Sequence, residues 1–463
     1  MAENTIKKTN KPPFSWRDEL GYIFGDMAGS FVNLFIDAFY LTFCTYVLGV
    51  SPIFMGNLFL FARLFDAIND PIIGSFPDRW RLGKKGDKFK PYIKIAMWPL
   101  ALANILCFTD VSSFGDTAMH VWVSLAYILY GVSYTGTSMP FGAMANVITD
   151  KPEERTKLSR ARSIGGTVVG FGALSIVPLF AWDANNAPIP KAFFIIAVIF
   201  AILSLLGYTA LMHMTHERIA EAPKKEENFN YGMVIKDAFR NRPLIGVMVA
   251  TVGSLIYITG NSQLGQIMFK EYYNRPDILA YVNFASLFVL LVALPTVPRM
   301  ANALGKQKTI LFAVAANFIL SLFLMLVPIA NPYLFAALFI IANIGQTCFT
   351  MLIWALVSDC LDYHQFKFGY RSDGSLYSIY TFSRKIGSTL ASTLASYALA
   401  GIGFVSGVAA QTAEVSEHIR LLYTAVPVVT TVLELIGIGL IFNLNKERTD
   451  AIYQELQAEH RDR

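Results

Sequence analysis

Residues 192–211 have the sequence AFFIIAVIFAILSLLGYTAL, an apolar run of 20 residues without a charged side chain. About 20 such residues are needed for an α-helix to cross the hydrocarbon core of a bilayer. The whole chain of 463 residues follows the same trend, since 54% of its residues are hydrophobic and only 15% are charged. A typical soluble domain has about 25% charged residues. This deficit excludes a disordered chain, a nucleic-acid-binding domain and most soluble enzymes, and it indicates a membrane protein.

Similar segments recur along the chain, so we expect an all-α membrane protein with twelve transmembrane helices. Their expected positions are roughly 20–48, 52–77, 91–110, 119–148, 160–182, 190–213, 243–269, 277–298, 308–329, 332–358, 374–405 and 419–443. The longest polar interruption, residues 216–243, falls between the sixth and seventh segments. The chain is therefore expected to form two six-helix bundles, at 20–213 and 243–443, with a linker at 214–242 and tails at 1–19 and 444–463.

The basic residues indicate the orientation in the membrane. Most of the 38 Lys and Arg residues lie in the two tails, the linker and the other loops on the side of the termini. Cytoplasmic loops carry such an excess of basic residues. We expect both termini to be cytoplasmic in a multi-pass protein of the inner membrane. The net charge of +5 is explained by this asymmetry and calls for no nucleic-acid partner, and the polar N-terminus shows no removable signal peptide.

The second expected span retains charged residues in the sequence FARLFDAINDP, residues 61–71. At about 100° per residue, Arg63, Asp66 and Asp70 share one face of the helix, with Asn69 on its flank. An Asp or Arg at the centre of a membrane helix costs roughly 2.5–3.5 kcal/mol, so such residues indicate a functional site. Carboxylate and amide oxygens suit a small hard cation. We expect a bound cation or proton here, because one arginine cannot neutralise two buried carboxylates; the alternative is a helix-packing ion pair.

A polar stripe follows the eleventh expected span at intervals of three or four residues. Its members are Tyr377, Thr381, Lys385, Ser388, Ser392 and Ser396. Small hydroxyl residues alone are typical of close helix packing in membranes. Lys385 favours a functional role instead, because an ammonium group in mid-span needs a carboxylate or a polar cavity. The aspartates of the second span are its expected partners.

Two further spans offer polar groups. In the first span, Asp26 and Asp37 either line a cavity or have a local structural role. The fourth span contains Tyr134, Thr135, Thr137, Ser138 and Asn146, interrupted by Gly131, Gly136 and Pro140. Interrupted helices near the midplane are where transporters form their solute sites, although glycine is also common at ordinary packing faces.

A basic, glycine-containing loop recurs at the same place in each half of the chain. GSFPDRWRLGKK, residues 74–85, follows the second span and contains Asp78 and Arg79; PRMANALGK, residues 298–306, follows the eighth. Such a recurrence is expected of two repeated bundles. The first copy resembles the loop signature of the major facilitator superfamily, and the second is a weaker echo. A gating role and a purely topological role are both open for these charges, and Arg63 shares the gating interpretation.

Several motifs in order along the chain carry a resemblance to a known family. They are YIFGD (22–26), ARLFDAINDP (62–71), KFKP (88–91), DKPEERTKL (150–158), SDCLDY (358–363), GSLYS (374–378) and FSRK (382–385). Together they resemble the glycoside-pentoside-hexuronide:cation symporters, the branch of the major facilitator superfamily that contains the melibiose carriers.

The resemblance implies two six-helix bundles around a central cavity, which rock against one another to give alternating access. It matches Asp66, Asn69, Asp70 and Thr135 to the family's cation ligands, for sodium or alternatively lithium or a proton. It places Lys385 between cation and sugar, and Arg162 at the sugar. Beyond the coupling ion no cofactor is expected, and the partners are a sugar or glycoside and the lipid bilayer, with a functional monomer.

The sequence also departs from the melibiose carriers. Ser30 and Ser138 occupy positions where those carriers hold the sugar with carboxylates, so galactoside recognition of that kind is not implied. YTFSRK, residues 380–385, resembles members that carry glucuronides or sulfoquinovosides. Serines beside Arg162, Arg384 and Lys385 suit an anionic sugar, but neutral pentoside carriers also have a basic pair, so both substrate classes stay open. Further expected substrate-binding residues are Asp26, Thr381 and, as aromatic platforms, Trp354 and Tyr377.

These observations predict cation-coupled sugar symport, in which sodium compensates the carboxylates, Lys385 reorients and the sugar then binds. A proton-only sugar symporter is the nearest rival, and a lysolipid carrier on the same fold is another. An enzyme is not expected, since the six histidines lie outside the spans or at their ends and no HExxH motif, nucleophile elbow or phosphate loop occurs. A receptor is disfavoured because neither tail is long enough for a signalling domain. His364 is expected to be a solvated helix-end residue, and the four cysteines are expected to be packing residues.

Overall fold

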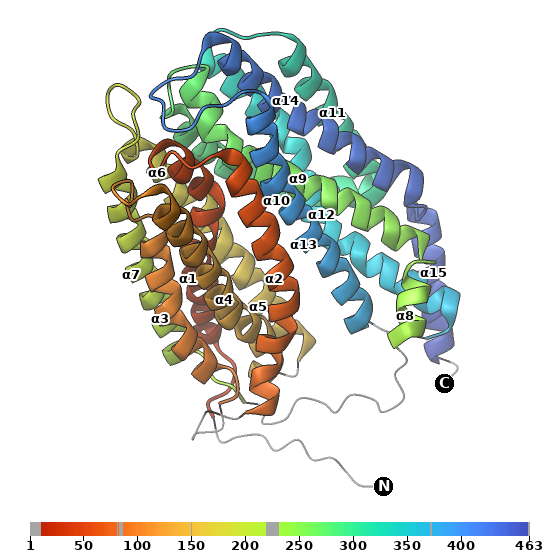
Figure 1. The fold of residues 1–463 in the computed structure, drawn as a ribbon. Helices are drawn as coiled ribbons and strands as arrows, with labels where there is room; N and C mark the ends of the chain where they lie inside the picture. Colours follow the sequence, from red (N-terminus) through yellow and green to blue (C-terminus); the bar gives the residue numbers. More distant parts are fainter. Residues whose placement is uncertain are drawn as a thin grey trace. The chain divides into compact units, whose positions relative to one another are not determined.

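The computed structural model describes residues 11–80, 82, 87–149, 151–218, 231–370 and 373–461. These residues are organised almost entirely as α-helices, and two helices continue through a π-helical turn (Figure 1). The chain divides into two compact units. Unit 1 comprises residues 1–225 and 405–409, and unit 2 comprises residues 226–404 and 410–463.

The helices of the first half correspond to the first six expected spans. They are α1 (Trp16–Tyr46), α2 (Pro52–Arg79), α3 (Lys90–Cys107), α4 (Asp116–Ile148), α5 (Pro152–Thr167) continued by the π-turn η1 (Val168–Ala173) and α6 (Leu174–Phe180), and α7 (Pro190–Met214). The fifth span is thus one helical rod with a π-helical turn at its centre. In Figure 1 these helices are coloured from red to yellow-green.

The second half supplies the other six spans and two additional helices. They are α8 (Tyr231–Ala238), α9 (Arg242–Glu271), α10 (Ile278–Leu304), α11 (Lys306–Leu326), α12 (Pro332–Phe368), α13 (Asp373–Gly401), α14 (Ala413–Leu435) with the π-turn η2 (Ile436–Ile441), and α15 (Lys446–Arg461). The expected all-α fold is confirmed, and the helices accommodate the twelve expected spans. Eight of the described helices are long and apolar enough to cross a membrane, judged by length and composition alone. Together with α2, α3, α4 and α13 they correspond to the twelve expected spans.

Short polar residues followed by proline define where several helices begin. At the starts of α2, α9 and α12, hydrogen bonds from backbone N–H groups are accepted by the side chains of Ser51, Asn241 and Asn331. Each of these helices also has a proline within its first two positions. A capping oxygen satisfies an N–H group that has no partner inside the helix, and proline has no N–H group to lose there. These caps place the helix ends at the expected span boundaries.

The KFKP motif at the start of α3 is explained by a carboxylate from a distant segment. Glu217, just beyond α7, accepts hydrogen bonds from the backbone N–H groups of Phe89 and Lys90 at 3.0 and 2.9 Å, and from that of Lys88. A negative charge at a helix N-terminus is favourable. Burial nevertheless raises the pKa of Glu217, and the three N–H groups oppose that rise. The contact ties the end of α7 to the start of α3.

In unit 1, α1 is the central helix. In an apolar stretch of 18 residues, 72% of the residues of α1 are buried, compared with 33% in the corresponding stretch of α7. Glycines allow its neighbours to approach its backbone closely: a Cβ atom added at Gly165 of α5 would lie 2.6 Å from the Ile23 carbonyl oxygen, and one at Gly207 of α7 would lie 2.7 Å from that of Phe24. Small residues at such contacts are typical of membrane helices. The polar residues of α1 are therefore held in the interior of the unit.

The outward face of α7 shows the opposite character. Phe194, Ile195, Ile199, Ile202 and Leu206 are 39–60% exposed along this helix. An apolar face of this extent would be unfavourable in water but suits contact with lipid tails. The chain is accordingly a multi-pass membrane protein.

His364 differs from its expectation. It is fully buried, with 0% exposure, and its ring contacts those of Phe368 and Tyr370 at 4.6 and 5.1 Å. The expectation of a solvated helix-end residue is wrong, because the segment following α12 folds back over the ring. All four cysteines are buried with free thiols, as expected of packing residues.

Candidate functional site

Asp70 of α2 and Thr135 of α4 meet in the interior of unit 1. The Thr135 hydroxyl donates a hydrogen bond to the Asp70 carboxylate, with an Oγ1–Oδ1 distance of 2.7 Å. The two residues are only 7% and 5% exposed. A hydroxyl that donates to a carboxylate keeps lone pairs with which to accept or coordinate. The structure thus brings together two of the four predicted cation ligands from positions far apart in the sequence.

The other two predicted ligands lie on the same stretch of α2. Asp66 packs against Gly131, one turn before Thr135: a Cβ atom added at Gly131 would lie 3.0 Å from Asp66 Oδ1. One turn further along α2, from residue 66 to 70, the contact on α4 also moves one turn forward, from residue 131 to 135. The two helices therefore run in the same direction here. The side-chain nitrogen of Asn69 is buried and has no hydrogen-bond partner among the described residues. This nitrogen is a hydrogen-bond donor that lacks an acceptor among those residues, and a cation would be coordinated by the amide oxygen of Asn69 instead.

Arg63, on the same face of α2, interacts with carboxylates on two helices. Its guanidinium group lies 3.6 Å from Asp37 of α1 and 3.8 Å from Asp66. Asp37 also accepts a hydrogen bond from Asn33 at 3.2 Å, and Tyr130 of α4 donates to Asn33 at 2.7 Å. The structure thus gives Asp37 a partner. Asn33 was not anticipated from the sequence, but it continues the spacing of Asp26, Ser30 and Asp37 along one face of α1.

Asp26 and Arg162 form the next polar contact of unit 1. Arg162 Nε donates to Asp26 Oδ1 at 3.1 Å, and Ser30 Oγ lies 3.5 Å from Asp26 Oδ2. The guanidinium group also lies over the ring of Phe141, 5.5 Å from its centroid. Gly166 makes room for the carboxylate, because an added Cβ atom would lie 3.1 Å from Asp26 Oδ2. Three of the predicted substrate-binding residues therefore form one group, and Ser138 is half-buried on α4.

Carboxylates outnumber guanidinium groups in these contacts. Asp26, Asp37, Asp66 and Asp70 contribute four carboxylates, whereas Arg63 and Arg162 contribute two guanidinium groups. The described residues contain no group of three or more His, Cys, Asp or Glu side chains suited to a metal ion. The predicted ion ligands form a different kind of set, in which two carboxylates are combined with an amide and a hydroxyl.

In unit 2, Arg384 and Trp354 form the core of the predicted substrate site. The guanidinium group lies over the Trp354 ring, 5.2 Å from its centroid, and Tyr380 packs edge-on against the same ring at 5.4 Å. Trp354 is 42% exposed. An exposed aromatic face beside a fixed guanidinium group can hold both a sugar ring and an anionic substituent.

The remaining predicted residues of α13 differ in their surroundings. Lys385 is exposed and Thr381 half-buried. The side chains of Tyr377, Asp78 and Arg79 lie outside the described part of the structure. Pairing of Lys385 with the α2 aspartates would join the two units and remains a prediction. Further along α13, Ser392 accepts a hydrogen bond from Gln263 of α9 at 3.0 Å, so this end of the polar stripe serves helix packing.

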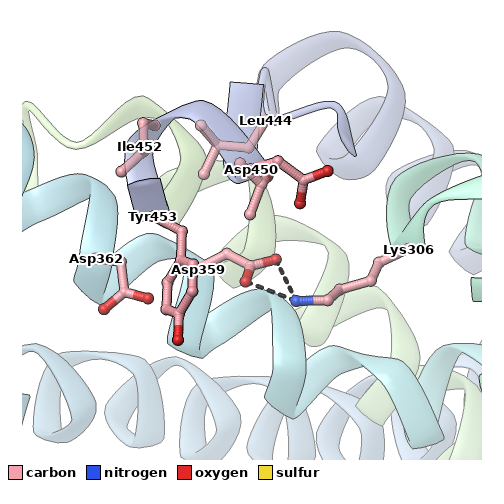
Figure 2. A pocket seen from close by; sticks show the side chains of 8 residues that line it. Lys306, Asp359, Asp362, Leu444, Asp450, Ile452 and Tyr453 are labelled. Atoms are coloured by element: carbon pink, nitrogen blue, oxygen red, sulfur yellow. Dashed lines mark hydrogen bonds and ion pairs between the residues drawn. The ribbon is translucent and has the colours of Figure 1, made fainter. Parts of the chain in front are cut away.

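A cavity of about 250 Å³ lies beside α15 in unit 2. Lys306 binds both carboxylate oxygens of Asp359 there, at 2.6 and 2.9 Å, and Figure 2 shows Asp362, Asp450 and Tyr453 around this pair. Lys306 belongs to the second copy of the glycine-containing loop. The contact joins the start of α11 to the end of α12, which gives this copy of the loop a structural role.

The fold and these polar interiors define a membrane transporter rather than an enzyme. The family model described as MFS/sugar transport protein matches residues 21–446. The chain belongs to this family, and it is a sugar transport protein of the major facilitator superfamily.

Its relatives carry related names. The chain is 29% identical to the uncharacterized symporter YjmB of Bacillus subtilis, over 98% of each chain. It is 30% identical to a putative sulfoquinovose importer of Salmonella typhimurium, over 96% of this chain and 93% of that protein. It is 29% identical to a putative 2,3-dihydroxypropane-1-sulfonate exporter of the same organism, over 97% of each.

The fold is also seen in solved transporter structures. A bacterial homolog of the human lysosomal transporter Spinster, in an inward-facing and unoccupied conformation, matches with a TM-score of 0.62 at 15% identity. The match covers 95% of this chain and 97% of that one. At this identity the similarity supports the fold alone.

Proposed function

We propose that this protein couples the movement of a sugar or glycoside to that of a sodium ion by alternating access. The observation that carries the proposal is the buried Asp70–Thr135 hydrogen bond of 2.7 Å, with Asp66 and Asn69 on the same stretch of α2. Buried hydroxyl and amide oxygens next to a carboxylate supply neutral ligands for a metal cation. A proton needs no such shell, and this favours sodium over a proton.

The charges of unit 1 supply the driving force for cation binding. Four carboxylates and two guanidinium groups take part in the contacts described above. Closing a dry cavity around carboxylates is costly unless their charge is paired. We expect a sodium ion held by Asp66, Asn69, Asp70 and Thr135 to offset the charge of these carboxylates, so that the loaded carrier can change conformation more easily than a half-loaded one.

Each unit contains residues that we propose to contact the sugar. Unit 1 contributes Asp26, Ser30, Ser138 and Arg162, and unit 2 contributes Trp354, Tyr377, Thr381, Arg384 and Lys385. We propose an anionic sugar as the preferred substrate. Support comes from the Arg384 guanidinium group over the Trp354 ring at 5.2 Å and from relatives whose names refer to sulfonated substrates.

The setting of this activity follows from the same reasoning. We propose that a monomer acts in the inner membrane with both termini in the cytoplasm, since basic residues are concentrated on that side. Uptake and export use the same cycle, and the relatives include proteins named importer and exporter. The net direction depends on the gradients.

A panel of sugars tests both the ion and the substrate class. Binding of a neutral pentoside, a galactoside, a glucuronide and a sulfoquinovoside is measured by calorimetry on the purified protein, in sodium and in potassium at one pH. We expect an anionic sugar to bind most tightly of the four. We also expect its affinity to be much higher in sodium than in potassium. Linkage requires that sugar tighten sodium by the same factor. Equal affinities in the two salts would contradict ion-promoted binding, and sealed-vesicle uptake driven by a pH gradient without a sodium effect would assign a proton instead.

Gly131→Ala is expected to weaken sodium binding without unfolding the protein. The new methyl group would lie 3.0 Å from Asp66 Oδ1 and force the carboxylate to shift. A displacement of this kind costs about 1 kcal/mol, roughly a fivefold rise in the sodium concentration for half-maximal sugar binding. Gly115→Ala at the start of α4 is the matched control, because its added Cβ atom has nothing within 4 Å. Equal sodium dependence in both variants would place Asp66 outside the ion site.

A further inference from the structure

Glu434 of α14 is completely buried in unit 2, with 0% exposure. Neither of its carboxylate oxygens has a hydrogen-bond partner among the described residues. An ionised carboxylate in such a place would have lost its hydration without any compensation. In the sequence, Glu434 is a single acidic residue in the apolar run of the twelfth expected span.

Polar side chains from the helices packed around α14 face this carboxyl group. On α9, Gly253 allows close approach, because a Cβ atom added there would lie 3.5 Å from Glu434 Cγ. Tyr257, one turn further along α9, is 2% exposed and its hydroxyl has no hydrogen-bond partner in the described part of the chain. Gln346 of α12 donates from its amide nitrogen to Ser254, and its amide oxygen is buried and likewise lacks a partner in that part.

The surroundings of Glu434 are neutral. Among the described residues, Gln346 interacts with the carboxyl group through its side-chain amide, Tyr257 is affected by its charge, and Asn317 of α11 interacts with Tyr257. In the described residues no lysine, arginine or histidine forms an ion pair with Glu434. A carboxylate with no basic neighbour and no water shell is neutralised most readily by taking up a proton.

We propose that Glu434 is a proton-binding site of unit 2, separate from the sodium site proposed in unit 1. A proton bound to the Glu434 carboxylate provides a hydrogen-bond donor for the unpartnered amide oxygen of Gln346. The Tyr257 hydroxyl is not hydrogen-bonded to this group in the structure, and the carbonyl oxygen of the neutral acid could accept from it after a small side-chain rotation. A single proton can therefore serve polar groups from three helices at once. This inference rests on the contacts of unit 2 and does not depend on sodium coupling.

Infrared spectroscopy of the purified full-length protein tests the proposal. A protonated carboxylic acid has a carbonyl stretch that an ionised carboxylate lacks and that shifts in heavy water. At neutral pH we expect the spectrum of wild type minus Glu434→Gln to contain this band. Glu414→Gln, at the exposed start of the same helix, is the matched control and should remove only an ionised carboxylate signal. A Glu434 difference spectrum with the ionised signal alone would overturn the proposal.

Sodium provides a further discriminating condition. If the cluster of Glu434, Gln346 and Tyr257 binds sodium instead, addition of sodium at constant pH should convert the protonated band into a carboxylate band. That outcome would overturn the assignment of a proton site. If the band is unchanged by sodium, the proton assignment stands.

Thermal unfolding gives a second measurement that does not depend on spectral assignment. In the unfolded chain a glutamate is ionised at neutral pH, so the folded chain holds one more proton than the unfolded chain. Stability then falls as the pH rises, by about tenfold in the folding equilibrium constant per pH unit. Glu434→Gln removes this dependence, because glutamine keeps the shape but cannot ionise. Its melting temperature should therefore rise relative to wild type from mildly acidic to mildly alkaline buffer, and a constant difference would contradict the proposal.

Discussion

Asp70→Asn is expected to abolish sodium-dependent sugar accumulation in sealed vesicles while the protein remains folded. Asparagine keeps an oxygen near Thr135 but removes the negative charge from the proposed ion site. Loss of one partner from a buried charged contact costs about 3 kcal/mol, which is roughly a hundredfold in affinity. The sodium concentration for half-maximal sugar binding should rise by that factor, as measured by calorimetry on the purified variant.

Two other variants make the Asp70 result specific. Asp116→Asn removes a carboxylate from the exposed first turn of α4 and should leave sodium dependence unchanged. Thr135→Val keeps the side-chain shape but removes the hydroxyl that donates to Asp70 at 2.7 Å, and it should cause a smaller loss than Asp70→Asn. Wild-type sodium dependence in Asp70→Asn would place the ion site elsewhere.

Gly345→Ala is expected to prevent unit 2 from folding stably. Gly345 lies where α12 crosses α11, and an added Cβ atom would be 2.3 Å from the Ala313 carbonyl oxygen and 2.7 Å from Asn317 Cβ. The first of these neighbours is backbone, so the whole helix must move. Overpacking in a core typically costs 1–3 kcal/mol, and we expect about 3 kcal/mol or more here. The measurement is the yield of monodisperse protein in detergent and its melting temperature.

Gly401→Ala is the matched control for Gly345→Ala. It lies near the end of α13, also in unit 2, and an added Cβ atom there has nothing within 4 Å. Its yield and melting temperature should equal those of the wild type. A normal melting temperature for Gly345→Ala would mean that α11 and α12 can separate slightly at little cost.

Apolar segment length was sufficient to predict the membrane helices, because each span must satisfy its own backbone hydrogen bonds in lipid. The same criterion could not predict α8 and α15, which are short or strongly charged. His364 shows another limit. Its position near a helix end suggested solvation, but the rings of Phe368 and Tyr370 that cover it belong to the helix end and to the segment that follows it.

Helical periodicity placed Arg63, Asp66 and Asp70 on one face, but it could not determine their partners on other helices. Asp70 meets Thr135, whereas Arg63 reaches back to Asp37 of α1. Such choices depend on how α1, α2 and α4 pack, which a single sequence does not reveal. Glu434 was missed because an isolated acidic residue gives no spacing pattern, and its significance comes from burial and from unpartnered neighbours on α9 and α12.

Arg162 and Asp26 form an ion pair with an Nε–Oδ1 distance of 3.1 Å. Asp26 therefore competes with any anionic ligand for the guanidinium group of Arg162. On the proposed role of these residues, a ligand that binds Arg162 must also compensate Asp26 for the lost contact. An inorganic anion without an O–H group, such as chloride or sulfate, has no hydrogen-bond donor to offer Asp26, so it can replace only half of the pair. A sugar acid can donate hydroxyl groups to Asp26 while its anionic group accepts from Arg162. The pair thus discriminates against anions that lack a hydrogen-bond donor before any contact with the sugar ring is made.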